Sequence, residues 1–301
     1  MKVLITGATG LVGHELIKTL LQNGIAVNYL TTSRKKIAKE TNYKGYYWNP
    51  LIGEINENAF DDVDVIIHLA GANVASRWTN NYKQEILDSR TKTTRLLYKT
   101  LSKIKHQVVQ VISASAIGIY PDSLNKVYKE DDDIVDDSFL GKVVSHWESE
   151  VSKLESLSIQ VVKIRIGIVL SEKGGALHKM AQPIKCGVGA SFGSGEQFQS
   201  WIHIQDLVSI FHFAITHKLN GVYNAVSPYP VTNKELTKAI AKQLEKPLFL
   251  PNIPKFVMKL ILGEMHEILF TSQNASARKL LDKGYQFKFA SLDKALQDLL
   301  K

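Results

Sequence analysis

The sequence contains a single cysteine, Cys186, among 301 residues. One cysteine cannot form an internal disulfide, which fits a reducing compartment, and we expect a cytoplasmic protein. The neighbours of Cys186 include no base that would activate a thiolate, so we expect a small packed residue there. No uncharged apolar run approaches the roughly 20 residues that a membrane-spanning helix needs. These absences argue against a disulfide scaffold and a membrane span.

The sequence also lacks a concentrated run of lysines, although it is basic as a whole. Its net charge is +8, but the lysines are scattered over many predicted helices and are not interleaved with aromatic residues as in a nucleic-acid site. We therefore expect neither a nucleic-acid nor a membrane partner. The nine histidines include no pair at metal-ligand spacing with a carboxylate, so no metal site is predicted. A small anionic ligand would benefit from the positive field.

Apolar strand patterns alternate with helical patterns over the first 170 residues. Strands are expected at 3–7, 25–31, 63–71, 108–113, 159–170 and 219–227, with helices from 11 to Gly24, near 80–104 and near 139–155. This alternation predicts an α/β fold with a Rossmann-like, doubly wound parallel sheet. We assign 1–170, with 200–227 returning to it, to a dinucleotide-binding domain. Residues 171–199 and 228–301 form a smaller, mainly helical substrate-side lobe.

The stretch ITGATGLVG places three glycines between the first strand and the first helix. A phosphate held at a helix start needs backbone amides within reach, and a Cβ in the turn would block its approach. Because the glycines follow a strand and open a helix, they predict a dinucleotide site rather than a merely structural turn. The predicted cofactor contacts here are Gly7, Thr9, Gly10, Leu11, Val12 and Gly13.

The end of the second predicted strand distinguishes between the two nicotinamide cofactors. An NAD site usually has Asp or Glu at this point to bind the ribose hydroxyls, but the run here is Thr-Thr-Ser-Arg-Lys-Lys, residues 31–36. Arg34 can pair with a 2′-phosphate and Ser33 can donate a hydrogen bond to it. We therefore predict NADP, with NADPH preferred over NADH. The alternative is that Arg34 starts a solvated helix.

With these residues assembled, the chain resembles the extended short-chain dehydrogenase/reductase superfamily. More closely, it resembles an atypical epimerase-like branch, an NAD-dependent epimerase/dehydratase-like family with an extra C-terminal segment of unknown function. The stretches that carry the resemblance run nearly end to end: TGATGLVG, HLAGANVASRWTNNYKQEILDSRTKTT, ISASAIGIY, RIGIVLSEKGGAL, FGSGEQFQSWIHIQD, LILGEMHEIL and KGYQF.

The resemblance implies further cofactor contacts. Leu69 and Ala70 would end the third nucleotide-binding strand along the cofactor ribose, and Val169 would form an apolar wall at the nicotinamide. Glu85 and Arg90 lie in the helix that flanks the cofactor in the family; the alternative for both is an exposed helix charge. The substrate would be a small polar molecule, with a sugar nucleotide as one candidate. Arg77 and Trp78 could supply a cation and a stacking face for it.

The tyrosine and lysine of the superfamily's acid/base pair are missing. In DSFLGKVVSHWESE the tyrosine position falls on Leu140 and the lysine position on Val144, and neither side chain can move a proton. Ser115 matches the serine that binds the substrate oxygen, with Ser113 as a rival. Tyr120 is the candidate proton donor; the alternative is a packed ring with a satisfied hydroxyl.

His203 is the other titratable candidate, although packing beneath the cofactor domain explains it better, and Asp206 is expected to cap a helix beginning at Leu207. Two functions remain open. The first is an NADP-dependent oxidoreductase or epimerase in which Ser115 positions the substrate oxygen. The second is an NADP(H)-binding sensor or scaffold that has lost catalysis, which the missing Tyr–Lys pair favours.

Overall fold

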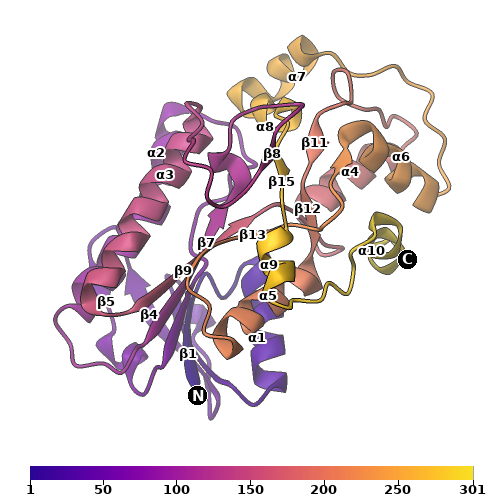
Figure 1. Ribbon diagram of the computed structural model, residues 1–301. Helices are drawn as coiled ribbons and strands as arrows, with labels where there is room; N and C mark the ends of the chain where they lie inside the picture. The colour runs from indigo at the N-terminus through magenta and orange to yellow at the C-terminus, as the bar shows by residue number, and fades with distance from the viewer. Residues whose placement is uncertain (301) are drawn as a thin grey trace.

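The computed structural model describes residues 1–300, and within them a nine-stranded, mainly parallel sheet runs through the molecule (Figure 1). Its strand order is β13-β9-β7-β6-β1-β2-β4-β3, with β5 paired to the end of β4. The parallel strands are β1 (Lys2–Thr6), β2 (Ala26–Thr31), β4 (Tyr43–Asn49), β6 (Val65–His68), β7 (Gln110–Ala116), β9 (Gln160–Ile166) and β13 (Gly221–Ala225). The short strands β3 (Lys39–Glu40) and β5 (Glu54–Ile55) are antiparallel to β4.

Helices cover both faces of this sheet. Helices α1 (Leu11–Gln22) and α5 (Ile204–Thr216) pack together on one face, and α2 (Asn80–Leu101) and α3 (Phe139–Ser152) pack together on the other (Figure 1). Because both faces are covered, the central strands are buried along their length, as the continuous apolar runs predicted. The predicted doubly wound Rossmann-like fold is therefore confirmed.

Local sequence sets the starts of the two long helices beside β7. The Thr79 hydroxyl accepts a hydrogen bond from the amide of Tyr82 at the start of α2, and Ser138 accepts one from Gly141 at the start of α3. Such caps satisfy amides that have no partner inside the helix. The expected helices near 80–104 and 139–155 therefore form with nearly the predicted bounds, and a 3₁₀ turn, η4 (Lys153–Leu157), follows α3.

Most of the remaining elements gather at one side of the sheet, toward the upper right of Figure 1, while α9 lies near the middle of the view beside β13. They are the helices α4 (Gly175–Lys185), α6 (Asn233–Gln243), α7 (Lys255–Leu262), α8 (Glu267–Phe270), α9 (Arg278–Asp282) and α10 (Leu292–Leu299). Three two-stranded pairs connect them: β10 (Ile168–Leu170) with β12 (Trp201–His203), β11 (Phe198–Gln199) with β14 (Val231–Thr232), and β8 (Val127–Tyr128) with β15 (Asn274–Ala275). Short 3₁₀ turns are η1 (Arg34–Lys36), η2 (Glu57–Phe60), η3 (Ile117–Ile119) and η5 (Gly263–His266).

Three local expectations were wrong or incomplete. The strand β4 was not predicted, because its polar and aromatic residues do not form an apolar run. The strand expected over 159–170 divides at Gly167, where the chain leaves β13 and pairs with β12. A Cβ at Gly167 would collide with the carbonyl oxygen of Ser200, so the crossing needs glycine. Cys186, expected to be packed, is exposed at the end of α4.

Within residues 1–300, no helix combines the length and apolar character that crossing a membrane would require.

Candidate functional site

The strand order reverses at β1, which lies between β2 and β6. The strands that follow β1 in sequence, β2 and β4, lie on one side of it. The later strands β6, β7 and β9 lie on the other side, in that order away from β1. In open α/β sheets, ligands bind beyond the carboxyl ends of the strands at such a reversal. The site is therefore bounded by the residues that follow Thr6, Thr31 and His68.

The glycine turn after β1 leaves room for a diphosphate. Gly7 has φ +72°, and a Cβ there would lie 2.8 Å from the backbone of Leu69, so the turn and the β6 end pass in close contact. A Cβ on Gly13 would collide with the backbone of Gly7 and Ala8. At Gly10 the nearest protein atom to such a Cβ is 3.3 Å away. Gly10 is exposed, and apart from its chain neighbours only the Gly7 carbonyl oxygen lies within 4 Å of such a Cβ, so most of the space around it is open to a ligand.

The first turn of α1 supplies the matching donors. Gly10 is its N-terminal cap and has no side chain to bond the free amides. Within the described chain, the amide of Gly10 reaches Gly7, but no acceptor is found for the amides of Leu11 and Val12. Helix N-termini attract anions through such amides and through the helix dipole. The residues present therefore fit the diphosphate of a dinucleotide.

A buried polar clamp fixes the two strand ends beside this turn. The hydroxyl of Thr6 accepts hydrogen bonds from the amides of Leu69 (3.2 Å) and Ala70 (3.1 Å). Its own proton therefore points to Nδ1 of His68, 2.7 Å away. His68 then donates from Nε2 to Thr94 at 3.1 Å, and Thr94 donates to the carbonyl of Arg90 at 2.7 Å. This directional chain joins β1, β6 and α2.

The protonation state of His68 follows from its surroundings. Burial, together with the nearby charge of Arg90, lowers the pKa of His68 from 6.5 to about 3. A neutral ring is also what the clamp requires, because Nδ1 must accept from Thr6. His68 therefore acts as a fixed spacer near neutral pH, and the turn at Leu69 and Ala70 lies against the glycine loop.

The predicted 2′-phosphate residues lie at the end of β2. Ser33 is half-buried, and its amide donates to the Thr31 hydroxyl. The side chain of Arg34 is 69% exposed, and its guanidinium lies 3.8 Å from the centre of the Tyr47 ring. It also forms an ion pair with Glu54 at 3.5 Å. The guanidinium therefore has a defined position and remains accessible to solvent.

The two charged residues predicted on α2 have different environments. Arg90 is largely buried, donates to the carbonyls of Ala72 and Ile86, and lies over the Trp147 ring. Burial lowers its pKa from 12.5 to about 10, so it stays charged near neutral pH. It thereby anchors the loop that follows Ala70. Glu85 is exposed, and the described residues give it no hydrogen bond or ion pair.

Val169 lies near the glycine turn, although it is far from it in sequence. A Cβ built on Gly175 would lie 3.3 Å from the Leu11 side chain and 3.8 Å from the Val169 carbonyl oxygen. The Lys173 ammonium, between them in sequence, pairs with Glu15 of α1 at 2.8 Å. The segment after β10 therefore packs against the start of α1, which puts Val169 beside the cofactor end of the sheet.

Ser115 and Tyr120, the predicted catalytic residues, belong to one buried polar network. The Ser115 hydroxyl donates to Glu148 at 2.5 Å, and Arg165 binds both oxygens of that carboxylate at 2.9 and 3.0 Å. Arg165 also donates to the Tyr120 hydroxyl at 2.9 Å, and Tyr120 donates to Asn224 at 2.8 Å. The network therefore connects β7, β9, β13 and α3.

The electrostatics of this network favour fixed positions. Burial raises the pKa of Tyr120 above its ordinary value of 10.0, although Arg165 and Asn224 oppose the shift. Burial disfavours the charge of Arg165, but its hydrogen bonds and ion pair with Glu148 outweigh that cost and raise its pKa. The Tyr120 ring is fully buried. Ser113, the rival of Ser115, is also buried and donates to the Ala114 carbonyl.

The vacant tyrosine and lysine positions are apolar in their surroundings as well. Val144 is buried in a cluster with Ile117, Ile119 and Tyr120. Leu140 packs on a second cluster that includes Trp78, Val143 and, from the C-terminal region, Met265 and Ile268. Tyr120 is the candidate proton donor in the first of these clusters, and its ring is fully buried.

The candidate substrate-holding pair is only partly available to a ligand, whereas the histidine at β12 is packed as expected. Arg77 is exposed, but Trp78 is buried, donates to the Val74 carbonyl and lies edge-on to Phe139, so it offers no free stacking face. His203 is buried against Phe289 and accepts from the Gln205 amide, and burial lowers its pKa to about 4. Packing therefore explains His203 better than catalysis does.

Asp206 does not cap the helix expected to begin at Leu207. Helix α5 begins at Ile204, with His203 as its cap. The Asp206 carboxylate instead accepts from the amides of Lys288 and Phe289, at 2.8 and 2.9 Å. It thus ties the C-terminal segment to α5, a long-range contact that a local capping rule does not reveal.

Sequence reasoning named Ser115 and Tyr120 but missed Thr6, His68 and Arg165, the other strand residues of the two polar networks. Thr6 and His68 lie inside apolar strands, and Arg165 lies inside another. Polar residues in a strand buried on both faces need internal partners. That signal could have identified them as network members, although their partners on distant helices could not have been read from it.

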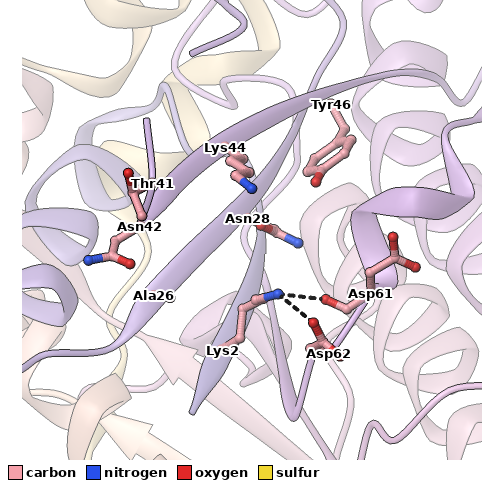
Figure 2. Close-up of a pocket in the computed structure, with 9 residues that line it drawn as sticks. All are labelled: Lys2, Ala26, Asn28, Thr41, Asn42, Lys44, Tyr46, Asp61 and Asp62. Atoms are coloured by element: carbon pink, nitrogen blue, oxygen red, sulfur yellow. Dashed lines mark hydrogen bonds and ion pairs between the residues drawn. The ribbon is translucent and has the colours of Figure 1, made fainter. Parts of the chain in front are cut away.

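Two hollows of the surface lie away from the glycine turn. One cavity of about 210 Å³ is lined by Lys2, Asn28, Lys44 and Tyr46 among others, at the amino ends of the strands (Figure 2). There Lys2 donates to the Asp61 carbonyl and pairs with Asp62. The other, of about 460 Å³, lies beside Arg34 at the edge of β4. Residues 1–300 contain no group of three or more side chains that could hold a metal ion.

The comparisons with known proteins agree with this geometry. The sequence profile of the NAD-dependent epimerase/dehydratase family matches residues 3–225, and a domain of unknown function (DUF1731) matches residues 253–299. The chain is 35% identical over 303 residues to the epimerase family protein YfhF of Bacillus subtilis (strain 168), with 100% of this chain and 98% of that protein covered.

Solved structures show the same arrangement. The crystal structure of the human epimerase family protein SDR39U1 (isoform 2) with NADPH has a TM-score of 0.87 and 30% identity, with 99% of each chain covered. The UDP-glucose 4-epimerase of Thermus thermophilus in complex with NAD has a TM-score of 0.77 at 18% identity, with 99% and 97% covered. The second likeness shows a common fold alone.

Proposed function

The chain belongs to the NAD-dependent epimerase/dehydratase family, as the sequence resemblance predicted, and we propose that it is an NADP(H)-dependent oxidoreductase or epimerase acting on a small polar substrate. The observation that carries the proposal is the glycine turn, whose free amides and open space at Gly10 face the strand-order reversal. The proposal includes a cytoplasmic location and no nucleic-acid or membrane partner.

The preference for NADP(H) rests on charge. The end of β2 carries Arg34 and Ser33 and no carboxylate of its own, and an accessible guanidinium suits a phosphate dianion. The structure of the human relative with NADPH supports this choice. In the proposal, Gly7, Thr9, Gly10, Leu11, Val12 and Gly13 hold the diphosphate, and Ser33 and Arg34 the 2′-phosphate.

The bound cofactor would supply the hydride chemistry at its nicotinamide ring. The chain's own residues orient and enclose the cofactor. Leu69 and Ala70 lie along its ribose, and Val169 forms an apolar wall at its nicotinamide. Arg90 anchors the loop that follows Ala70. Ser115 would position the substrate oxygen. Since its proton is directed to Glu148, Ser115 can act toward a ligand only as an acceptor. A proton at the substrate oxygen would therefore come from water or from Tyr120 after rearrangement of its hydrogen bonds.

A second candidate function is a redox-dependent sensor or scaffold that binds NADP(H) without turnover. The observation that favours it is the catalytic end of the sheet, where Leu140 and Val144 lie in apolar clusters. The hydroxyls of Ser115 and Tyr120 are also occupied within the protein. We rank it below the enzyme because the serine is retained.

The test is a cofactor titration followed by a turnover screen. Calorimetry with NADPH and NADH should give binding of both cofactors, tighter for NADPH. Carbonyl compounds are then screened for loss of nicotinamide absorbance and sugar nucleotides for epimerised product, since epimerisation leaves the cofactor's redox state unchanged overall, with Ser115→Ala as the comparison variant. Turnover that falls in the variant supports the enzyme. Tight NADPH binding without turnover of any compound favours the sensor, and absence of heat with either cofactor contradicts both.

A further inference from the structure

Arg34 is held between an aromatic ring and a carboxylate. Its guanidinium lies 3.8 Å from the Tyr47 ring centre and 3.5 Å from Glu54. Glu54 reaches it because β5 folds back on β4 and pairs Glu54 with Asn49, while Tyr47 stands opposite Thr31 at the end of β2. Residues from three strands or strand ends therefore meet at one cation.

The contact with Glu54 is loose compared with that with Tyr47. A close ion pair between guanidinium and carboxylate has N–O distances of about 2.7–2.9 Å. The pair here is longer, and Glu54 itself is 47% exposed. Stacking fixes the plane of the guanidinium, and the carboxylate occupies only part of its donor set. The remaining donors are free for a second anion.

The wider surroundings of Arg34 are positive. The cavity of about 460 Å³ beside it is lined by Arg34, Lys39, Lys44, Tyr47 and Asn56 among others, and its described lining includes no acidic residue. Glu54 is therefore the acidic side chain that competes with a phosphate for the Arg34 guanidinium. Its removal should strengthen the attraction to a dianion more than the attraction to a neutral ribose hydroxyl.

We propose that Glu54 sets the ratio of NADPH to NADH affinity by competing with the 2′-phosphate for Arg34. The inference rests on the proposed function, because it assumes that a nicotinamide dinucleotide binds at the glycine turn. With NADPH, the phosphate must take donors from Glu54 or share them. With NADH, which has no 2′-phosphate, the ion pair between Glu54 and Arg34 stays intact, so the Arg34 guanidinium is not left unpaired. Glu54 therefore reduces the discrimination that Arg34 alone would give.

The experiment compares wild type, E54Q and E57Q by calorimetry with NADPH, NADH and adenosine 2′,5′-bisphosphate. Glu57 is exposed three residues away and has no described ion pair, so E57Q removes the same charge as a matched control. An exposed ion pair is worth about 0.2–1 kcal/mol, so E54Q should bind NADPH and the bisphosphate about twofold to fivefold more tightly. Its NADH affinity should stay unchanged, and E57Q should match wild type.

A double-variant cycle tests whether the effect passes through Arg34. In an R34A background, E54Q should no longer improve NADPH binding, because the guanidinium for which the two anions compete is gone. If E54Q and E57Q behave alike, or if the gain from E54Q persists without Arg34, the inference is wrong while the proposed function stands. If wild type binds no dinucleotide, the proposed function fails first.

Discussion

The two ends of the proposed reaction site are built on different principles. At the cofactor end, Gly10 and the first turn of α1 offer donors and space that the protein itself does not use. At the catalytic end, the hydroxyls of Ser115 and Tyr120 each have a protein partner, and Leu140 and Val144 are apolar. Unused polar groups indicate a place for a ligand, whereas satisfied ones indicate structure. The contrast shows that the polar groups are left free at the glycine turn and are paired within the protein at Ser115 and Tyr120.

The largest effect should come from breaking the catalytic-end network. Glu148→Ala leaves Arg165 buried without its carboxylate, which costs about 3–5 kcal/mol of unfolding free energy. Urea unfolding measures the loss, with the exposed Glu155→Ala as a control that changes little. If Glu148→Ala were as stable as the control, the network of Ser115, Glu148 and Arg165 would not stabilise the fold. The contrast between the two ends of the site would then be wrong.

A smaller effect, confined to the cofactor end, is expected from Gly10→Ala. Its Cβ would lie 3.3 Å from the Gly7 carbonyl oxygen, a tight contact that a shift of a few tenths of an ångström relieves, and would occupy the space assigned to the diphosphate. NADPH affinity should fall at least tenfold, about 1.4 kcal/mol, with little change in melting temperature. Gly7→Ala is the contrasting variant. Its Cβ would collide with the backbone of Leu69, so it should lower both the NADPH affinity and the melting temperature. If Gly10→Ala bound NADPH as tightly as wild type, the cofactor's diphosphate would not lie at Gly10, and the proposed position would be wrong.

Arg34→Ala should lower the affinity for NADPH by about tenfold and the affinity for NADH much less, because only NADPH carries the 2′-phosphate. The neighbouring exposed Lys35→Ala serves as the control for loss of one positive charge. Calorimetry with NADPH and with NADH gives, for each cofactor, the ratio of the variant's dissociation constant to that of wild type. Equal weakening of NADPH and NADH would mean that Arg34 supports the site in general, without reading the phosphate.

The smallest effect concerns pH and the clamp at His68. Its pKa is about 3 in the folded protein and 6.5 as the ordinary value, so below pH 6.5 the unfolded chain binds a proton that the folded chain does not. Stability is therefore highest well above pH 6.5 and falls as the pH drops toward 3, by only about 0.4 kcal/mol between roughly pH 7.5 and 6.5. His203, with a pKa of about 4, adds a loss of the same sign.

Denaturant unfolding at several pH values measures the total, and histidine NMR signals identify the contributor. The His68 ring should show no titration down to about pH 5 while the protein remains folded. A His68 signal that titrates near its ordinary pKa of 6.5 would contradict the neutral clamp and the hydrogen-bond directions derived from it.

Much of the fold could be predicted because its signals are local. Continuous apolar runs marked the buried strands, and helical spacing of apolar residues marked α2 and α3, whose capping residues Thr79 and Ser138 the structure then revealed. The strand β4 escaped prediction since its residues Tyr43–Asn49 follow no apolar pattern, and only pairing with β2 makes it a strand. The exposure of Cys186 and the partners of Asp206 likewise depend on packing between segments distant in sequence.

The sequence by itself determined the glycine turn, the cation at the end of β2 and the loss of the tyrosine and lysine, because each is a matter of residue type at a fixed spacing. Only the tertiary structure decided the direction of each proton in the Thr6–His68 clamp, the occupation of Ser115 and Tyr120 within one network, and the pairing of Arg34 with Glu54. These depend on which side chains meet across strands and helices, and hydrogen bonds and ion pairs act only over a few ångströms.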